Sequence, residues 1–132
     1  MASPLFRLVC PAAALEGAPE GWASDMLVDG EVALLIGDGD LKAVNAAAHA
    51  LDHNTVSVVR TEETPELQEQ TVIAHARQLP LIWIERGFSS ETRKWAVSRG
   101  PMTLIIENEG ALPEVERGRI TRFVALLGRQ TD

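Results

Sequence analysis

The pattern of apolar and polar residues changes at position 32, where an unbroken apolar run begins. Residues 32–36 read Val-Ala-Leu-Leu-Ile, and a Gly-Asp-Gly-Asp segment follows at 37–40. An apolar run without alternation is typical of a strand that is buried on both faces, as in a parallel sheet covered by helices. The glycines after it predict a turn into a helix that is capped by Asp40.

The same alternation of strand patterns and helix patterns continues to the end of the chain. Apolar residues at helical spacing predict a helix over 40–52, and a run of β-branched residues predicts a strand over 55–59. We expect three more helices and two more strands, at residues 64–79, 81–84, 89–100, 102–106 and 112–128. This alternation predicts an α/β fold, a three-layer sandwich around a mainly parallel sheet of four to five strands, Rossmann-like or flavodoxin-like.

Residues 1–30 do not show this alternation of strand and helix patterns. A short strand is expected over 5–10, at the edge of the sheet, followed by a helical turn near 12–16 and a second short strand at 26–28. Two prolines and three glycines lie between positions 11 and 30. A chain of 132 residues fits a single domain, so we expect 1–30 to pack on it as an irregular segment that is held by Trp22.

Composition narrows the function classes. A formal net charge of −7 disfavours nucleic acid as a partner, because phosphate binding needs a basic surface. Cys10 is the one cysteine, which fits a reducing compartment and which we expect to be a buried small hydrophobe. No apolar run approaches transmembrane length, and 5–10 is too short for the core of a signal peptide. We therefore expect a cytoplasmic protein without membrane contact.

Candidate ligand-binding residues fall in the loops after the predicted strands. In a parallel sheet the carboxyl ends of the strands share one edge, and ligands bind there where the strand order reverses. The loops 37–40, 60–63, 85–89 and 107–110 should meet at that edge. The candidates are Gly37, Asp38, Gly39, Asp40, Glu62, Glu85 and Glu107.

Two ligands suit these candidates, and neither is established by the pattern. A dinucleotide fingerprint lacks its third glycine, because Lys42 stands there, and the acids would repel a pyrophosphate. Mg²⁺ prefers carboxylate oxygens, so Asp38, Asp40, Glu85 and Glu107 are candidate metal ligands. A tight turn and acids at helix N-termini explain the same residues without a ligand. No cofactor and no catalytic residue is therefore predicted, and Mg²⁺ or a nucleotide remains an alternative.

One segment resembles a known family. The residues that carry this are Gly87-Phe88-Ser89-Ser90-Glu91-Thr92, Trp95-Ala96, Leu104-Ile105, Glu109 and Leu112. Over residues 81–115 the chain resembles the C-terminal half of the Mrr-type restriction endonuclease-like domain. The resemblance implies a related or degenerate nuclease fold. The family's catalytic lysine has no counterpart, because the chain's two lysines, Lys42 and Lys94, lie on predicted helices.

Three functions therefore stay open. The first is a non-catalytic module for protein interaction or self-assembly, with residues 11–30 and the helix 64–79 as contact surfaces. The second is an enzyme or sensor that binds a nucleotide or Mg²⁺ at residues 37–40, and the third is a degenerate nuclease-like protein associated with DNA.

Basic residues collect in the C-terminal third of this acidic chain. They are Arg93, Lys94, Arg99, Arg117, Arg119, Arg122 and Arg129. They form either a solvated face or a docking surface for an acidic partner or a second copy.

Overall fold

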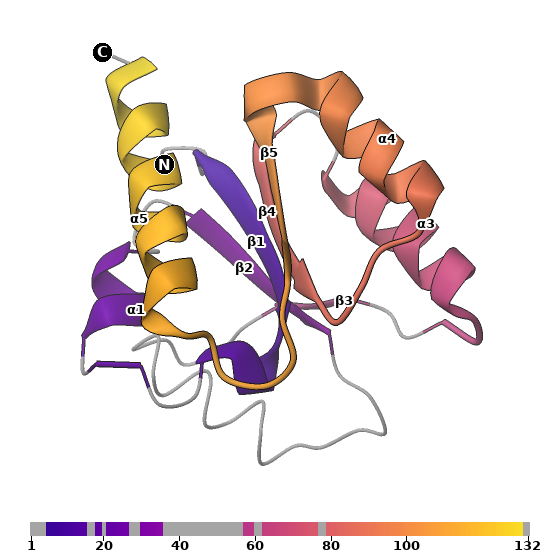
Figure 1. Ribbon diagram of the computed structural model, residues 1–132, viewed down its shortest axis with the longest axis horizontal. Helices are drawn as coiled ribbons and strands as arrows, with labels where there is room; N and C mark the ends of the chain where they lie inside the picture. The colour runs from indigo at the N-terminus through magenta and orange to yellow at the C-terminus, as the bar shows by residue number, and fades with distance from the viewer. Residues whose placement is uncertain are drawn as a thin grey trace.

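A parallel sheet of five strands forms the centre of the protein. The computed structural model describes residues 5–15, 18–19, 21–26, 30–35, 57–59, 62–76 and 79–130. The strands are β1 (Phe6–Pro11), β2 (Gly30–Leu35), β3 (Ser57–Val59), β4 (Leu81–Glu85) and β5 (Thr103–Glu107). Every neighbouring pair runs parallel, in the spatial order β3-β2-β1-β4-β5 (Figure 1). The predicted α/β sandwich around a parallel sheet is thus confirmed.

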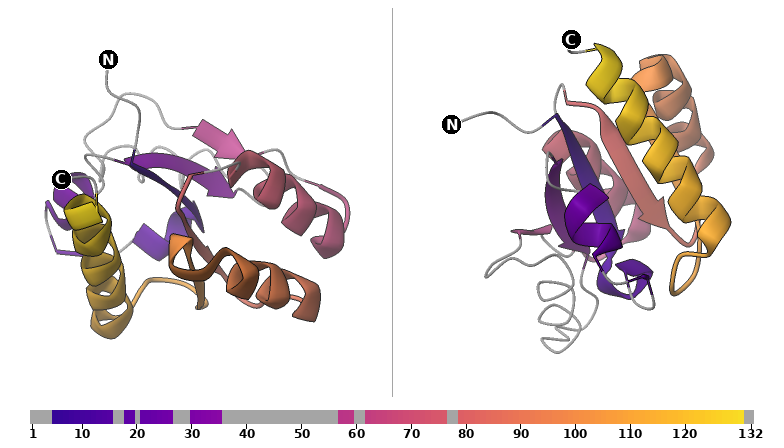
Figure 2. Two further views of the ribbon diagram at one scale, coloured as in Figure 1. Left: turned by 90° about the horizontal axis from the view of Figure 1, so that it is seen from above. Right: turned by 90° about the vertical axis from the view of Figure 1, so that its left-hand side faces the viewer.

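Helices cover both faces of this sheet. On one face lie α3 (Pro65–Ala76) and α4 (Ser90–Arg99), which ends in the short 3-10 helix η2 (Gly100–Met102). On the other lie α1 (Trp22–Met26), α5 (Glu114–Gln130) and the 3-10 helix η1 (Ala12–Leu15). Figure 2 shows the layers from above, with α3 and α4 on the side of the sheet opposite to α5. No described helix is long and apolar enough to cross a membrane.

Each face of the sheet has its own hydrophobic core, because successive strand residues point to opposite faces. Leu8 of β1 packs in a cluster with Ile120 of α5. Val9 and Trp83 belong to the other cluster, with Val72 of α3. Strands with two buried faces need apolar residues at every position, which explains the unbroken runs in the sequence.

β1 lies in the middle of the sheet, between β2 and β4, so the expectation of an edge strand is wrong. Arg7 is the one charged residue of this strand, and charged side chains are mostly exposed in folded proteins. Its guanidinium instead donates hydrogen bonds to the carbonyls of His75 and Ala76, at 2.5 and 3.4 Å, and lies 3.3 Å from the carboxylate of Glu31. The negative end of the α3 dipole thus compensates a charge at the end of a central strand.

The N-terminal segment contains more helix than its composition suggests. The expected helical turn near 12–16 is confirmed as η1, but Met26 ends α1 instead of beginning a strand. The backbone N–H groups of Trp22 and Asp25 donate to the carbonyls of Pro19 and Gly21, which closes a helical turn locally. The predicted helix 40–52 lies outside the described residues.

Candidate functional site

The direction in which the chain fills the sheet reverses next to β1. From β1 the chain adds β2 and β3 on one side, and then crosses to add β4 and β5 on the other. In open parallel sheets, ligands bind in the crevice beyond the carboxyl ends of the strands at such a reversal. These ends lie at the lower edge of the sheet in Figure 1.

A pocket of about 460 Å³ opens at this edge, on the side covered by α3. Its walls are the ends of β1, β2 and β4 together with the start of α3. The lining residues are Pro11, Leu35, Glu62, Glu63, Thr64, Pro65, Gln68, Glu69, Glu85, Arg86 and Gly87. The volume lies within the range of small-molecule sites, roughly 300–1,000 Å³.

Carboxylates dominate the charge of this lining. Glu62 and Glu63 precede α3, Glu69 lies on α3 and Glu85 ends β4, while among the described lining residues Arg86 contributes the one cationic group. The Arg86 side chain is 83% exposed and extends toward Glu109, with 3.9 Å between Nε and Oε1. The described walls therefore attract cations and hydrogen-bond donors, and repel phosphates.

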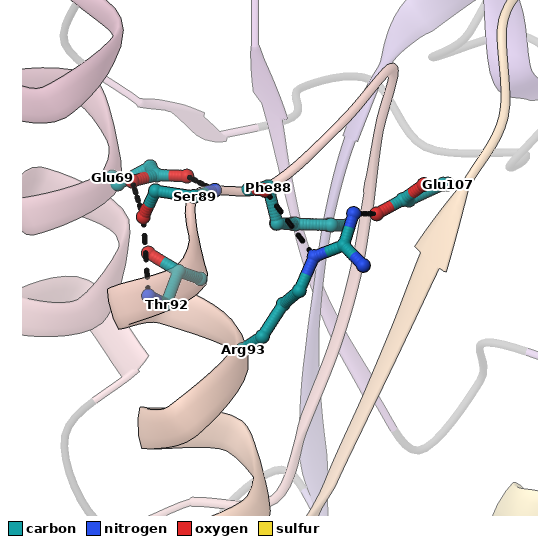
Figure 3. A network of polar contacts seen from close by, with 6 residues as sticks. All are labelled: Glu69, Phe88, Ser89, Thr92, Arg93 and Glu107. Atoms are coloured by element: carbon teal, nitrogen blue, oxygen red, sulfur yellow. Dashed lines mark hydrogen bonds and ion pairs between the residues drawn. The ribbon is translucent and has the colours of Figure 1, made fainter.

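Glu69 is buried, and its carboxylate is held in place by Ser89 (Figure 3). Ser89 donates its backbone N–H to Oε2 at 2.8 Å and its hydroxyl to Oε1 at 2.6 Å. Burial alone would raise the pKa of Glu69, but the hydrogen bonds from Ser89 and Thr92 outweigh it and lower the pKa below its usual value. Glu69 is therefore a fixed negative charge in the pocket wall.

The pKa of Glu85 is shifted in the opposite direction, upward. Burial at the end of β4 raises the pKa of its carboxyl to about 7, and the negative charge of Glu69 adds to the shift. The indole N–H of Trp83, which is buried without a hydrogen-bond partner among the described residues, lowers the pKa by less than either of these two causes raises it. Two carboxyl groups of one pocket thus differ in protonation near neutral pH.

Two residues of α3 fix Glu62 at the rim. The hydroxyl of Thr71 donates to Glu62 Oε1 at 2.9 Å, and the Glu62 backbone N–H donates to Gln68 Oε1 at 3.0 Å. Because Gln68 and Thr71 are about one helical turn apart, both reach the segment that enters α3. The carboxylate is therefore oriented before any ligand binds.

The structure brings together two of the residues that the sequence suggests. Glu62 and Glu85 line the same pocket. Glu107 lies beside Glu85 in the strand register, but its carboxylate forms an ion pair with Arg93 of α4 and does not line the pocket (Figure 3). The remaining candidates, Gly37, Asp38, Gly39 and Asp40, lie outside the described residues.

Sequence reasoning missed Glu69, although a signal for it exists. Glu69 shares the buried stripe of α3 with Val72 and Ala76, and a charged residue on such a stripe needs a partner. Among the described residues, no group of three His, Cys, Asp or Glu side chains is placed to hold a metal ion.

The other candidate residues serve the core. Cys10 is fully buried, as expected, and burial raises the pKa of its thiol to about 12. Trp22 packs against the core on the α5 face. On α3, Val72 and Ala76 point inward, whereas Leu67 remains 45% exposed.

Comparison with protein families, curated proteins and solved structures found no match for this chain. The resemblance of residues 81–115 to the Mrr-type domain stays a prediction.

Proposed function

We propose that this protein is a small-molecule binding module whose pocket holds an organic cation, such as a primary amine or a guanidinium compound. The observation that carries the proposal is the pocket of about 460 Å³ with four carboxylates and one arginine in its described lining. Its position supports the proposal, because the strand order 3-2-1-4-5 is the order that begins a doubly wound dinucleotide fold, where the reversal point is the binding site.

The protonation states of the two inner carboxyl groups favour a cation over an anion. Glu69 is held ionised by Ser89, and Glu85 has a pKa of about 7 partly because of that charge. A cation bound beside them would compensate Glu69 and allow Glu85 to ionise, which adds a second attraction. A phosphate would be repelled by the negative charge of Glu69 and would disfavour the ionisation of Glu85. The described walls therefore support an amine better than a nucleotide.

Calorimetry and thermal shift with a panel of ligands test the proposal. We expect diamines and arginine to raise the melting temperature, and inorganic phosphate, nucleotides and MgCl₂ to leave it unchanged. Because Glu85 must ionise, affinity should rise about tenfold between about pH 6 and about pH 8, the change expected for one group that titrates near 7.

Two variants locate the site. Glu85→Gln should weaken amine binding and remove its pH dependence. Asp25→Asn removes an exposed carboxylate from α1, on the opposite face of the sheet, and should change neither. The proposal is overturned if no amine binds, or if amines bind the Glu85→Gln variant with unchanged affinity and pH dependence.

A further inference from the structure

The outer face of α5 carries exposed side chains that the fold does not use. Ile120 and Leu127 of this helix are buried against the sheet, whereas Val115 and Leu126 are 72% and 55% exposed. Figure 2 (right) shows α5, together with α1, in front of the sheet on the side that faces the viewer. This face is separate from the pocket, which lies on the α3 side.

Gly118 lies in the second turn of this helix, at a place where no contact within the described fold requires a glycine. A Cβ atom at position 118 would meet nothing within 4 Å, so no neighbouring group of the chain requires a glycine there. Glycine is among the least favourable residues in a helix interior. What it does permit is the close approach of another backbone, which points to a contact outside the chain.

The charges around Gly118 form a self-complementary pattern. Glu114, Gly118, Arg122 and Leu126 are spaced four residues apart, so they form one ridge along the helix. Gly118 lies midway between Glu114 and Arg122, which are both exposed. Arg119 pairs with Glu116 within the helix, but no ion pair among the described residues involves Glu114 or Arg122.

We propose that two copies of this chain associate through α5, with the two helices antiparallel and crossing at Gly118. A two-fold axis at Gly118 places Glu114 of each copy opposite Arg122 of the other, so that the contact forms two ion pairs. A second copy suits this ridge better than a uniformly acidic or basic partner, because the ridge presents one charge of each sign in mirrored positions. The net charge of −7 disfavours association through most other surfaces.

The predicted dimer is weak. One helix crossing buries less than the roughly 1,200 Å² that stable interfaces need, so we expect a dissociation constant in the micromolar range or above. The association must therefore be measured over a wide range of concentrations.

Sedimentation equilibrium from about 10 µM to about 1 mM tests the dimer, because this range brackets the expected constant. Glu114→Arg and Arg122→Glu should each weaken dimerisation at least about tenfold, since each sets like charges opposite one another. The double variant should restore dimerisation, because it exchanges the two charges. Glu91→Arg, which reverses an exposed acid in the first turn of α4, is the matched control and should have no effect.

A substitution at Gly118 provides a second, independent test of the dimer. Gly118→Leu should abolish dimerisation by blocking the crossing, while circular dichroism shows an unchanged or raised melting temperature for the monomer, since the added side chain points into open space. The proposal is overturned if the wild-type chain stays monomeric throughout the range. A dimer that tolerates Glu114→Arg or Gly118→Leu, or that the double variant does not restore, also overturns it.

Discussion

The carboxylate of Glu69 accepts two hydrogen bonds from Ser89, twenty residues further along the chain. The hydroxyl of Ser89 also accepts the backbone N–H of Thr92 at 3.1 Å and so caps α4. One buried acid therefore joins α3 to the first turn of α4 and closes one wall of the pocket. Its negative charge also lies at the positive end of the α4 dipole, which stabilises it.

Removing this link should destabilise the fold. Glu69→Ala leaves the Ser89 N–H without its acceptor, so we expect a loss of about 2–3 kcal/mol in the free energy of unfolding. Urea denaturation of the two single variants and of the double variant with Ser89→Ala measures the coupling, which should be about 1–2 kcal/mol. Additive losses would show that the two side chains do not act together.

The same link predicts a pH dependence. Because the pKa of Glu69 is lowered in the folded state, its contribution to stability is present above the ordinary value of 4.5 and is lost as the pH falls below it. The melting temperature of the wild type should therefore fall more steeply in acid than that of Glu69→Gln. Parallel curves for the two proteins would contradict this.

The effect of Glu85 on folding stability should depend on pH in the opposite sense to that of Glu69. Its pKa is raised from 4.5 to about 7, so its ionisation opposes folding as the pH rises through this window. Glu85→Gln should stabilise the protein at about pH 8, by about 1 kcal/mol after solvent screening is allowed for, and give no gain at about pH 4.5. Urea denaturation at the two pH values measures this difference, and an equal effect at both would contradict it.

We expect Arg7 to contribute more to the stability of the fold than an exposed charged residue does. Arg7→Met removes the donor to the His75 and Ala76 carbonyls and leaves Glu31 without this cation, so we expect a loss of about 1–3 kcal/mol. Arg7→Lys keeps the charge but not the planar guanidinium, and should fall between the two. Denaturant midpoints order the three proteins, and an Arg7→Met variant as stable as the wild type would exclude this role.

Gly30 tests the contact between β2 and β1. Gly30 is the register partner of Phe6, and a Cβ at position 30 would overlap the phenyl ring. Gly30→Ala should therefore cost about 1–3 kcal/mol, because the ring must move. Gly87→Ala, where a Cβ meets nothing within 4 Å, is the control, and Phe6→Leu should partly rescue Gly30→Ala. Equal stability of the two alanine variants would contradict this packing.

The sequence by itself predicted the class of fold and most of the described elements, although not α1. Unbroken apolar runs appear where strands have two buried faces, and Ser89 marks the start of α4, because burial and capping act over a few neighbouring residues. It also predicted that Glu62 and Glu85 would share an edge, since the carboxyl ends of parallel strands must do so.

Tertiary structure alone decided what depends on contacts between distant residues. β1 is central because it pairs with both β2 and β4, and its Arg7 finds its hydrogen-bond acceptor at the end of α3, 68 residues away; no local pattern can indicate either contact. The inclusion of Glu69 in the pocket depends on its partner Ser89 in another helix. Which strands become neighbours, and which buried charges find partners, is settled by the packing of the whole chain, because each such contact needs both of its sides to be in place.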